Sequence, residues 1–386
     1  MKVLPRSRAG VVAQMLTASP AVGLLGPRQV GKSTLVQAIA AERDGLLVDL
    51  QRPQARSLLE DPTAFFGANA DRLVVIDEIQ RQPELFSALR PIIDDDRRPG
   101  RFLITGSASP ELMRGANESL AGRIFYAELP PLSLPEVSSH GLALAQHLLT
   151  GGYPQPLLQL DADTRGYWYS AYLSTFVTRD LAEFGVRTNT AELERLLSML
   201  AHLHGGLFNA SALARSLRIT APTVQRYLDV LEAAFLIRVL RPAHTNAGKR
   251  LAKSPRVYWR DSGLRHGLLG IGSYNELLLH PGLGASWEGY AIEEIARALD
   301  PRTRLSFYRT HGGAELDLVA ELPGGRVLAF ELKFSRGASL ARGFYAAVAD
   351  VKPVHAYVVV PEGETVVLRK GVTVMALPRL LEEIVV

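Results

Sequence analysis

Residues 21–42 read AVGLLGPRQVGKSTLVQAIAAE, an apolar run that passes through a glycine-bounded loop into a helical stretch. The loop has the spacing G-x-x-x-x-G-K-S and comprises Gly26, Pro27, Arg28, Gln29, Val30, Gly31, Lys32, Ser33 and Thr34. Glycines let backbone N–H groups converge on phosphate oxygens, and the helix N-terminus adds the positive end of its dipole. The stretch therefore predicts an ATP site in which Lys32 reaches the β- and γ-phosphates and Ser33 ligates Mg²⁺.

Four further apolar runs follow in the first third of the chain: GLLVDL (45–50), RLVVIDE (72–78), RFLITGS (101–107) and RIFYAEL (123–129). Continuous runs rich in Leu and β-branched residues indicate strands that are buried on both faces of a parallel sheet. Residues 1–130 are therefore expected to form an α/β domain.

The second element of the predicted site is the run that ends in Asp77 and Glu78. Carboxylates at the end of a parallel strand lie at the carboxyl edge of the sheet, beside the phosphate loop. We expect Asp77 to hold Mg²⁺ through water and Glu78 to orient the attacking water. Ser107 either contacts the γ-phosphate or caps a helix, and Arg123 is either an arginine finger for a neighbouring subunit or an ordinary surface residue.

Composition narrows the class of protein. Among 386 residues, 47% are hydrophobic and 21% charged, which is typical of a globular protein with several domains. The absence of cysteine excludes disulfides and suits a cytoplasmic protein. Since no apolar run approaches 18 residues, we expect no signal peptide and no contact with a membrane. The net charge of +4 permits a nucleic-acid partner without indicating one.

The motifs GPRQVGKSTL, VVIDEIQ and LITGSAS, in this order, resemble those of bacterial and archaeal AAA-type ATPases that carry a C-terminal DUF4143 domain. The segments GGYP (151–154) and STFVTRDL (174–181) are also similar to that family, so the resemblance covers nearly the whole chain. It implies a RecA-like AAA core in which Lys32, Ser33, Asp77 and Glu78 have the roles given above.

Residues 131–190 are expected to form a helical lid, whose aromatic residues either build its core or stack on bases. In residues 191–262, two capped helices joined by a short turn predict a helix-turn-helix, with Asn209 and Thr220 as N-caps. Two strands follow and complete a winged helix. Its wing is rich in basic residues, and its predicted DNA contacts are Gln225, Arg226, Lys249, Arg250 and Lys253, with Arg256 also counted in the wing. The alternative is a winged helix that serves only in subunit packing.

Residues 263–386 contain a helix with Glu288, then a strand, then two strands that carry Asp317 and Glu331-Leu332-Lys333 around the turn at Pro323-Gly324-Gly325. The period of two in a strand places Glu331 and Lys333 on one face, and Asp317 can approach them from the adjacent strand. Glu288, Asp317 and Glu331 are therefore candidate Mg²⁺ ligands, with Lys333 as a catalytic partner. The alternative is a hairpin with ordinary exposed charges.

This arrangement resembles the PD-(D/E)xK nucleases of restriction-endonuclease-like fold, except that Leu316 stands where proline often precedes the aspartate. The leading hypothesis is an oligomeric ATPase, a hexamer or another ring, that couples hydrolysis to binding, remodelling or processing of DNA, including branched DNA. Its C-terminal domain either cleaves DNA or only binds nucleic acid. The alternative is a nucleotide-controlled regulatory switch whose C-terminal domain is a non-catalytic interaction module.

Overall fold

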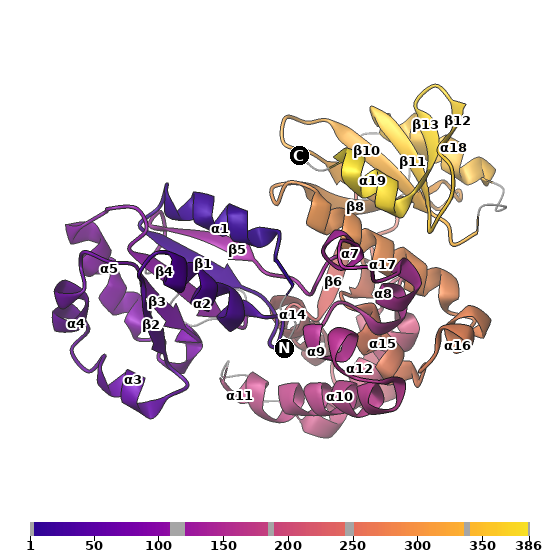
Figure 1. The fold of residues 1–386 in the computed structure, drawn as a ribbon. Helices are drawn as coiled ribbons and strands as arrows, with labels where there is room; N and C mark the ends of the chain where they lie inside the picture. Colours follow the sequence, from indigo (N-terminus) through magenta and orange to yellow (C-terminus); the bar gives the residue numbers. More distant parts are fainter. Residues whose placement is uncertain (1–3, 109–119, 184–188, 244–250, 336–339, 385–386) are drawn as a thin grey trace.

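The computed structural model describes residues 4–108, 120–183, 189–243, 251–335 and 340–384. The chain forms an N-terminal α/β domain, a helical middle segment and a C-terminal sheet, which lie at the left, lower right and upper right of Figure 1. No helix within the described residues combines the length and the apolar content that crossing a bilayer requires.

The N-terminal domain contains a five-stranded parallel sheet, as the sequence predicts. Its strands stand in the order β2 (Leu46–Asp49), β3 (Val74–Asp77), β4 (Phe102–Gly106), β1 (Ala21–Leu25) and β5 (Ile124–Glu128). The three central strands are buried along their whole length, whereas the edge strands β2 and β5 are only partly buried. The prediction of burial on both faces therefore holds for the centre of the sheet and is wrong for its edges.

Helices cover both faces of this sheet. Val22 and Leu24 of β1 pack in the same apolar cluster as α1 (Arg8–Leu16) and α2 (Lys32–Glu42). The alternate residues Ala21 and Leu25 face the other cluster, which contains residues of α4 and α5. The remaining elements on this domain are α3 (Pro53–Ser57), α4 (Pro62–Ala68), η1 (Ile79–Arg81) and α5 (Leu85–Asp95).

The middle segment is helical. It comprises α7 (Leu134–Ser138), α8 (Leu144–Thr150), α9 (Pro154–Leu158), α10 (Ala162–Thr175), the π-helical turn η2 (Phe176–Asp180), α11 (Leu181–Glu183) and α12 (Thr190–Leu203). Trp168 stacks on Tyr172 of the same helix, and the Tyr172 hydroxyl lies 2.9 Å from that of Tyr153. These contacts confirm the core interpretation of the aromatic residues, apart from Tyr167, which is 78% exposed.

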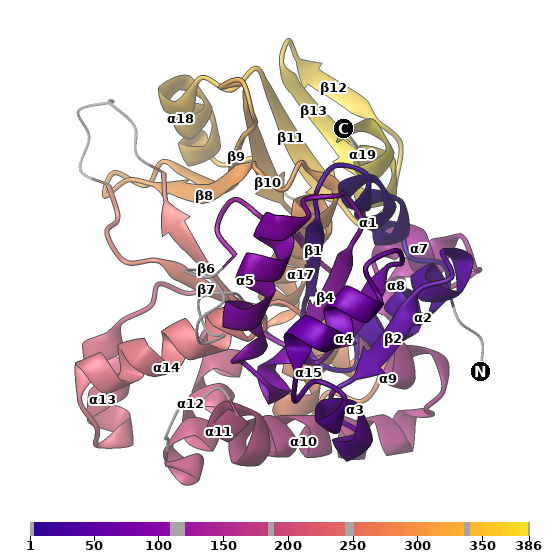
Figure 2. The ribbon, with the colours of Figure 1, turned by 90° about the vertical axis from the view of Figure 1, so that its left-hand side faces the viewer.

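The predicted helix-turn-helix corresponds to α13 (Ala210–Leu217) and α14 (Ala221–Ala233). Both predicted N-caps are confirmed, because Asn209 accepts a hydrogen bond from Ala212 N and Thr220 accepts one from Thr223 N. The hairpin of β6 (Ile237–Pro242) and β7 (Arg256–Trp259) follows, and Leu207 pairs with Arg256 of β7. Figure 2 shows α13 and α14 at one edge of the molecule.

The C-terminal sheet has eight strands and includes the β6–β7 hairpin. The hairpin joins it through the parallel pairs Arg241–Ser306 and Pro242–Phe307. The strand order is β12 (Val366–Arg369), β13 (Val372–Ala376), β11 (His355–Val360), β10 (Val327–Leu332), β9 (Glu315–Glu321), β8 (Arg304–Arg309), β6 and β7. The helices of this part are α15 (Ser262–Leu269), α16 (Tyr274–Leu279), α17 (Leu283–Ala298), α18 (Arg342–Val351) and α19 (Leu377–Ile384).

Candidate active site

The loop between β1 and α2 is shaped by residues in the left-handed backbone region. Gly26 has φ +149°, and a Cβ there would lie 2.3 Å from the carbonyl oxygen of Leu129. Gln29 and Gly31 also have positive φ, of 62° and 97°. Only glycine tolerates the close approach at Gly26, and the left-handed conformations turn the loop before α2 begins. The geometry is that of a phosphate-binding loop that ends at a helix N-terminus.

Lys32 is the first residue of α2, and its side chain is buried at 4% exposure. Its ammonium donates hydrogen bonds to the backbone oxygens of Gly26 and Pro27, at 3.0 and 2.9 Å, and to Ser107 Oγ at 3.1 Å. The ammonium is therefore fixed at the centre of the loop, between the loop carbonyls and the end of β4.

Asp77 and Glu78 stand at the carboxyl end of β3, where the sequence predicts them. Thr105 of β4 donates to Asp77 Oδ1 and accepts from Glu78 N, the latter at 2.9 Å. Ser107 donates to the two carboxylate oxygens of Glu78, at 3.2 and 3.0 Å, and Gln80 also donates to this carboxylate. Glu78 itself has φ +61°, a strained conformation that costs about 1 kcal/mol and is typical of functional sites. The Glu78 carboxylate is thus held in one orientation.

The pKa shifts of this group follow from its burial and its mixed charges. Burial lowers the pKa of Lys32, while Glu78 and Asp77 oppose that change. Burial likewise raises the pKa of Asp77, against hydrogen bonds from Thr105 and Ser33. Burial acts to raise the pKa of Glu78, but Lys32, Gln80 and Ser107 together bring it below its usual value. One ammonium thus faces two carboxylates, which leaves a negative charge that favours a cation.

Ser33 and Asp77 fit a magnesium ion. The Ser33 side chain is hydrogen-bonded to the Asp77 carboxylate, so a hydroxyl and a carboxylate oxygen face one another beside Lys32. Mg²⁺ in proteins is bound by such oxygens, with several retained waters and substrate phosphates completing its shell.

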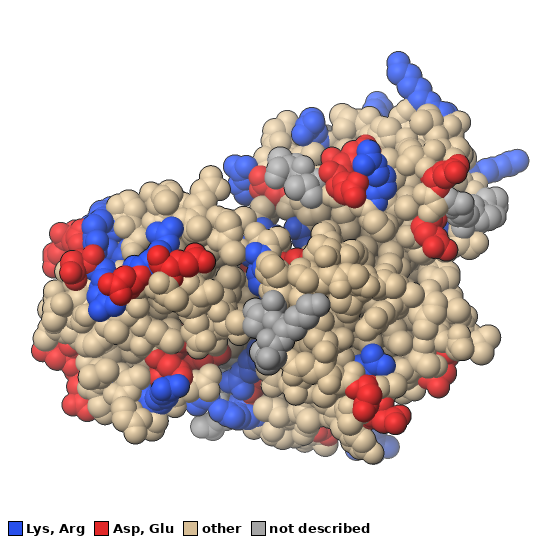
Figure 3. All heavy atoms as spheres, in the orientation of Figure 1, with Lys and Arg blue, Asp and Glu red and all other residues tan. Residues whose placement is uncertain are grey.

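The loop opens into a pocket of about 570 Å³. Besides the loop residues and Glu78, the pocket is lined by Gln51 and Arg81 and by residues of the helical segment, namely Pro154, Gln155, Gln159 and Arg179. Arg28 of the loop forms an ion pair with Asp180, at the end of the π-helical turn η2. Figure 3 shows basic side chains gathered where the N-terminal domain faces the helical segment. The predicted site therefore lies at an interdomain boundary.

Sequence reasoning missed the residues that η2 contributes. Arg179 and Asp180 occur in STFVTRDL, a segment whose resemblance to a family was visible but whose position beside the loop was not. The contact joins residues that are 152 positions apart, so no local pattern predicts it.

Arg123, the candidate finger, lies next to the edge strand β5 and forms two hydrogen bonds with Asp94. They measure 2.9 Å from Nε to Oδ1 and 2.6 Å from Nη2 to Oδ2. Hydrogen bonding to Arg123 lowers the pKa of Asp94 to about 2. Arg123 is not among the residues that line the loop pocket of its own chain.

Comparisons with known proteins identify the family of this chain. Family models match three consecutive segments: an AAA domain (AAA_14) at residues 18–138, a domain of unknown function (DUF8612) at 142–275 and another (DUF4143) at 283–380. Uncharacterized proteins of Mycobacterium tuberculosis and Mycobacterium bovis are each 41% identical over 362 residues, which span 94% of this chain and 81% of the relative. The chain belongs to the family of AAA-type ATPases with a C-terminal DUF4143 domain.

Solved structures similar to this chain have lower sequence identity. A Walker-type ATPase of Pyrococcus abyssi is 15% identical, with a TM-score of 0.46, over 69% of this chain and 96% of that chain. A point variant of RuvB from Thermotoga maritima is 19% identical with a TM-score of 0.32, over 61% of this chain and 90% of that chain.

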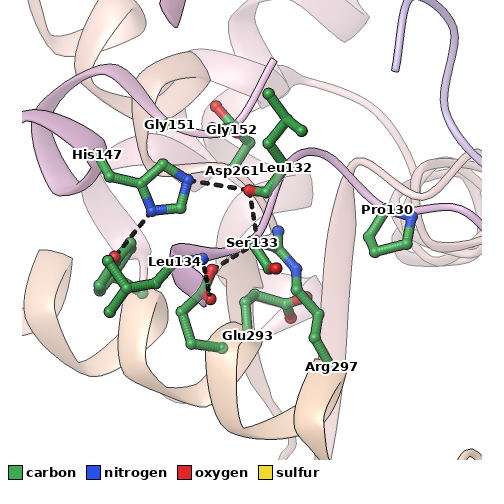
Figure 4. Close-up of polar contacts among 12 residues, drawn as sticks. Pro130, Leu132, Ser133, Leu134, His147, Gly151, Gly152, Asp261, Glu293 and Arg297 are labelled. Atoms are coloured by element: carbon green, nitrogen blue, oxygen red, sulfur yellow. Dashed lines mark hydrogen bonds and ion pairs between the residues drawn. The ribbon is translucent and has the colours of Figure 1, made fainter. Parts of the chain in front are cut away.

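A buried polar network holds the connector that follows the N-terminal domain against α8, the GGYP segment and Asp261 (Figure 4). The connector residue Leu132 accepts a hydrogen bond from His147 Nε2 at 2.9 Å and donates one to Gly152 O at 2.8 Å. Asp261 accepts from Gly152 N at 2.8 Å. A Cβ at Gly152 would lie 2.2 Å from Leu132 O, and one at Gly151 would lie 2.1 Å from Asp261 Oδ1. The glycines of GGYP thus permit a close backbone approach at the junction.

The predicted DNA contacts of this chain fall into three groups. Gln225 and Arg226 are exposed on α14, where Gln225 donates to Asp229 and the Arg226 guanidinium lies 5.7 Å from the centroid of the Tyr227 ring. Lys253 is exposed before β7, whereas Lys249 and Arg250 lie outside the described residues. The inclusion of Arg256 in the basic wing is wrong, because its side chain is buried at 5% exposure and faces the C-terminal carboxylates.

The predicted metal-site residues in the C-terminal part of the chain are close together, and an arginine lies among them. Asp317 and Glu331 stand on the adjacent strands β9 and β10, one residue beyond the Phe330–Leu318 pair. Glu331 pairs with Lys333 at 2.7 Å, and Asp317 Oδ2 accepts from Leu332 N at 2.9 Å. Among the described residues, no group of three or more His, Asp or Glu side chains is arranged to hold a metal ion. The residues present, with Arg256 between Glu288 and Asp317, do not fit a metal ion.

Proposed function

We propose that this chain is a Mg²⁺-dependent ATP hydrolase that couples ATP turnover to the binding and remodelling of DNA. The observation that carries the hydrolase is the series of hydrogen bonds, none longer than 3.2 Å, that joins Lys32 through Ser107 to Glu78 at the phosphate loop. The Ser33–Asp77 pair lies beside it. These residue types supply phosphate binding, metal binding and water positioning, which are the parts that phosphoryl transfer to water requires.

In this proposal each side chain has a distinct task. Lys32 and the loop N–H groups bind and orient the β- and γ-phosphates, while Ser33 and Asp77 hold Mg²⁺, which neutralises phosphate charge when bound. Glu78 orients the attacking water and accepts its proton, and Ser107 keeps the carboxylate in place. Gln155 and Arg179 of the helical segment line the pocket, so a bound nucleotide would contact both sides of the domain boundary.

DNA binding is proposed for the segment from α12 to β7. Its order of helix, paired residue Leu207, two helices and hairpin is the order of a winged helix. The exposed Gln225 and Arg226, with the basic wing, would contact backbone phosphates without reading sequence. We retain the domains proposed from the sequence: an ATPase core (1–130), a helical lid (131–190), a winged helix (191–262) and a restriction-endonuclease-like fold (263–386). The proposal further includes assembly into a ring in the cytoplasm, in which Arg123 contacts the nucleotide of a neighbouring subunit. It does not include metal-dependent cleavage, because Arg256 lies between the carboxylates of Glu288 and Asp317.

The experiment measures steady-state ATP hydrolysis by the full chain with and without duplex and branched DNA. We expect DNA to raise the rate, and the triple variant Lys249→Ala, Arg250→Ala, Lys253→Ala to bind DNA more weakly for all sequences alike. Each lost phosphate contact should lower the magnitude of the slope of log affinity against log salt concentration by about one. The control removes three exposed charges from other surfaces, Arg302, Lys370 and Arg379. The DNA part of the proposal would be rejected if DNA left the rate of ATP hydrolysis unchanged and the triple variant bound DNA as tightly as the parent.

The second candidate is a nucleotide-controlled switch whose C-terminal part is an interaction module. The internal pairing of Glu288 and Asp317 with Arg256 favours it, because these carboxylates already have a cation within the chain. A switch predicts that ATP changes the oligomeric state, measured by light scattering, while DNA leaves the rate of hydrolysis unchanged.

A further inference from the structure

An arginine occupies the centre of the acidic cluster in the C-terminal part of the chain. The cluster draws carboxylates from α17, β9 and β10, namely Glu288, Glu315, Asp317 and Glu331. Arg256 comes from β7, in a different segment of the sequence. Its Nη1 lies 3.1 Å from Glu288 Oε1 and 3.6 Å from Asp317 Oδ1, and its Nη2 forms an ion pair with Glu315.

The position of this guanidinium is fixed by its surroundings. Arg256 is 5% exposed, its backbone pairs with Leu240 in the hairpin, and its guanidinium carbon lies 4.9 Å from the centroid of the Phe307 ring. The Tyr258 hydroxyl, on the same strand and the same face, donates to Glu288 Oε1 at 2.5 Å. A long side chain on the surface would be free to swing into water, whereas this one is enclosed by strand, ring and carboxylates.

Asp317 faces that guanidinium, and Glu331 lies beside Asp317 on the neighbouring strand. Asp317 Oδ2 accepts a hydrogen bond from Leu332 N, and Asp317 Oδ1 faces Arg256. Glu331 is 8% exposed, and its Oε2 is a buried oxygen without a hydrogen-bond partner, although Lys333 contacts its Oε1. A divalent ion requires oxygens at about 2.0–2.6 Å, and a guanidinium a few ångströms away would repel it strongly. The Arg256 guanidinium thus lies between the Glu288 and Asp317 carboxylates, where a divalent ion would have to bind.

We propose that Arg256 takes the place of a divalent cation in this cluster. The wild-type chain then binds no divalent cation there, and loss of the guanidinium frees the side chains of Glu288, Asp317 and Glu331 to rearrange around one. The C-terminal part therefore acts without a metal, and the cluster serves to hold β7 of the helix-turn-helix segment against β9 and α17. This inference is independent of ATP hydrolysis at the phosphate loop.

The experiment counts bound Mn²⁺ by electron paramagnetic resonance on the full chain, without nucleotide and in a Ser33→Ala background that weakens the loop site. Arg256→Gln should bind about one Mn²⁺ per chain, at least roughly tenfold more tightly than the parent, because the repelling charge is gone. Adding Asp317→Asn should abolish this gain. Arg256→Lys keeps the positive charge and should resemble the parent. A folded Arg256→Gln variant that binds no Mn²⁺, or an Arg256→Lys variant that gains as much, would overturn the proposal.

Removal of Arg256 leaves buried carboxylates unpaired and can prevent folding, so a second comparison needs no change at this residue. The parent and its Asp317→Asn variant are titrated with Mn²⁺ side by side. Equal binding by the two supports the proposal. Binding of one Mn²⁺ by the parent that Asp317→Asn removes would show that the cluster takes a metal with Arg256 in place, and the proposal would fail.

Discussion

Glu293 of α17 lies at the ionic contact between the N-terminal domain and the rest of the chain, and its replacement by glutamine gives a quantitative prediction. Its carboxylate accepts from Arg238 Nη2 at 3.0 Å and from Arg260 Nε at 3.1 Å, and Arg260 also reaches Glu128 of β5 at 2.6 Å. Burial acts to raise the pKa of Glu293, but the two arginines bring it to about 2, against an ordinary value of 4.5. This difference corresponds to about 3 kcal/mol of stability at pH 7.

The sign of the pH dependence follows from the lowered pKa. The contribution of Glu293 is complete above pH 4.5 and is lost as the pH falls toward 2, because the unfolded chain then binds a proton that the folded chain does not. Glu293→Gln should lower the free energy of unfolding by about 3 kcal/mol at pH 7 and by progressively less below pH 4.5.

Urea unfolding followed by tryptophan fluorescence measures this loss, since Trp259 and Trp287 lie close to Arg260 and Glu293 in sequence and are buried. The matched control is Glu364→Gln, which removes an exposed carboxylate and should leave the midpoint unchanged. If Glu293→Gln unfolds at the parental urea concentration at pH 7, the ion pairs do not stabilise the interdomain contact as we argue.

Two further substitutions test the junction and the candidate finger. Gly152→Ala forces a Cβ against Leu132 O and should cost about 1–3 kcal/mol of stability, which lowers the melting temperature. The control Gly166→Ala in α10 meets no neighbour and should add about 1 kcal/mol. Equal melting temperatures of the two variants would contradict the close approach. If Arg123 is an arginine finger, Arg123→Ala should lower ATP turnover about a thousandfold or more with ATP affinity retained, while parental turnover would assign this residue to its surface pair with Asp94.

The sequence was sufficient for the N-terminal domain because its signals are local. Each of the five apolar runs forms a strand, and the loop and Asp77-Glu78 follow strands at the carboxyl edge of one parallel sheet. Parallel order itself brings these ends together, so Lys32 and Glu78 could be related without knowledge of side-chain packing. The partial burial of the edge strands does not follow from the sequence, because the same apolar pattern occurs at the centre and at the edge of a sheet.

Contacts between segments that are distant in the chain could not be predicted from the sequence. The pairing of β6 with β8 joins residues 241–242 to residues 306–307, which the sequence pattern assigns to two separate domains. Arg256 precedes an apolar strand and follows a basic stretch, so the sequence places it in the wing. In the structure it is buried among carboxylates from other elements. The sequence pattern does not indicate the short strand β12, because β12 is exposed along its length, without the periodic burial that marks a strand.

The central claim is that the phosphate loop hydrolyses ATP with Glu78 positioning the water. The most direct measurement compares single-turnover ATP hydrolysis and ATP affinity of the full chain with those of Glu78→Gln. The variant keeps the side-chain size and the contact with Ser107, so we predict ATP affinity close to the parental value and turnover reduced at least about a hundredfold. Parental turnover in the Glu78→Gln variant would contradict the account.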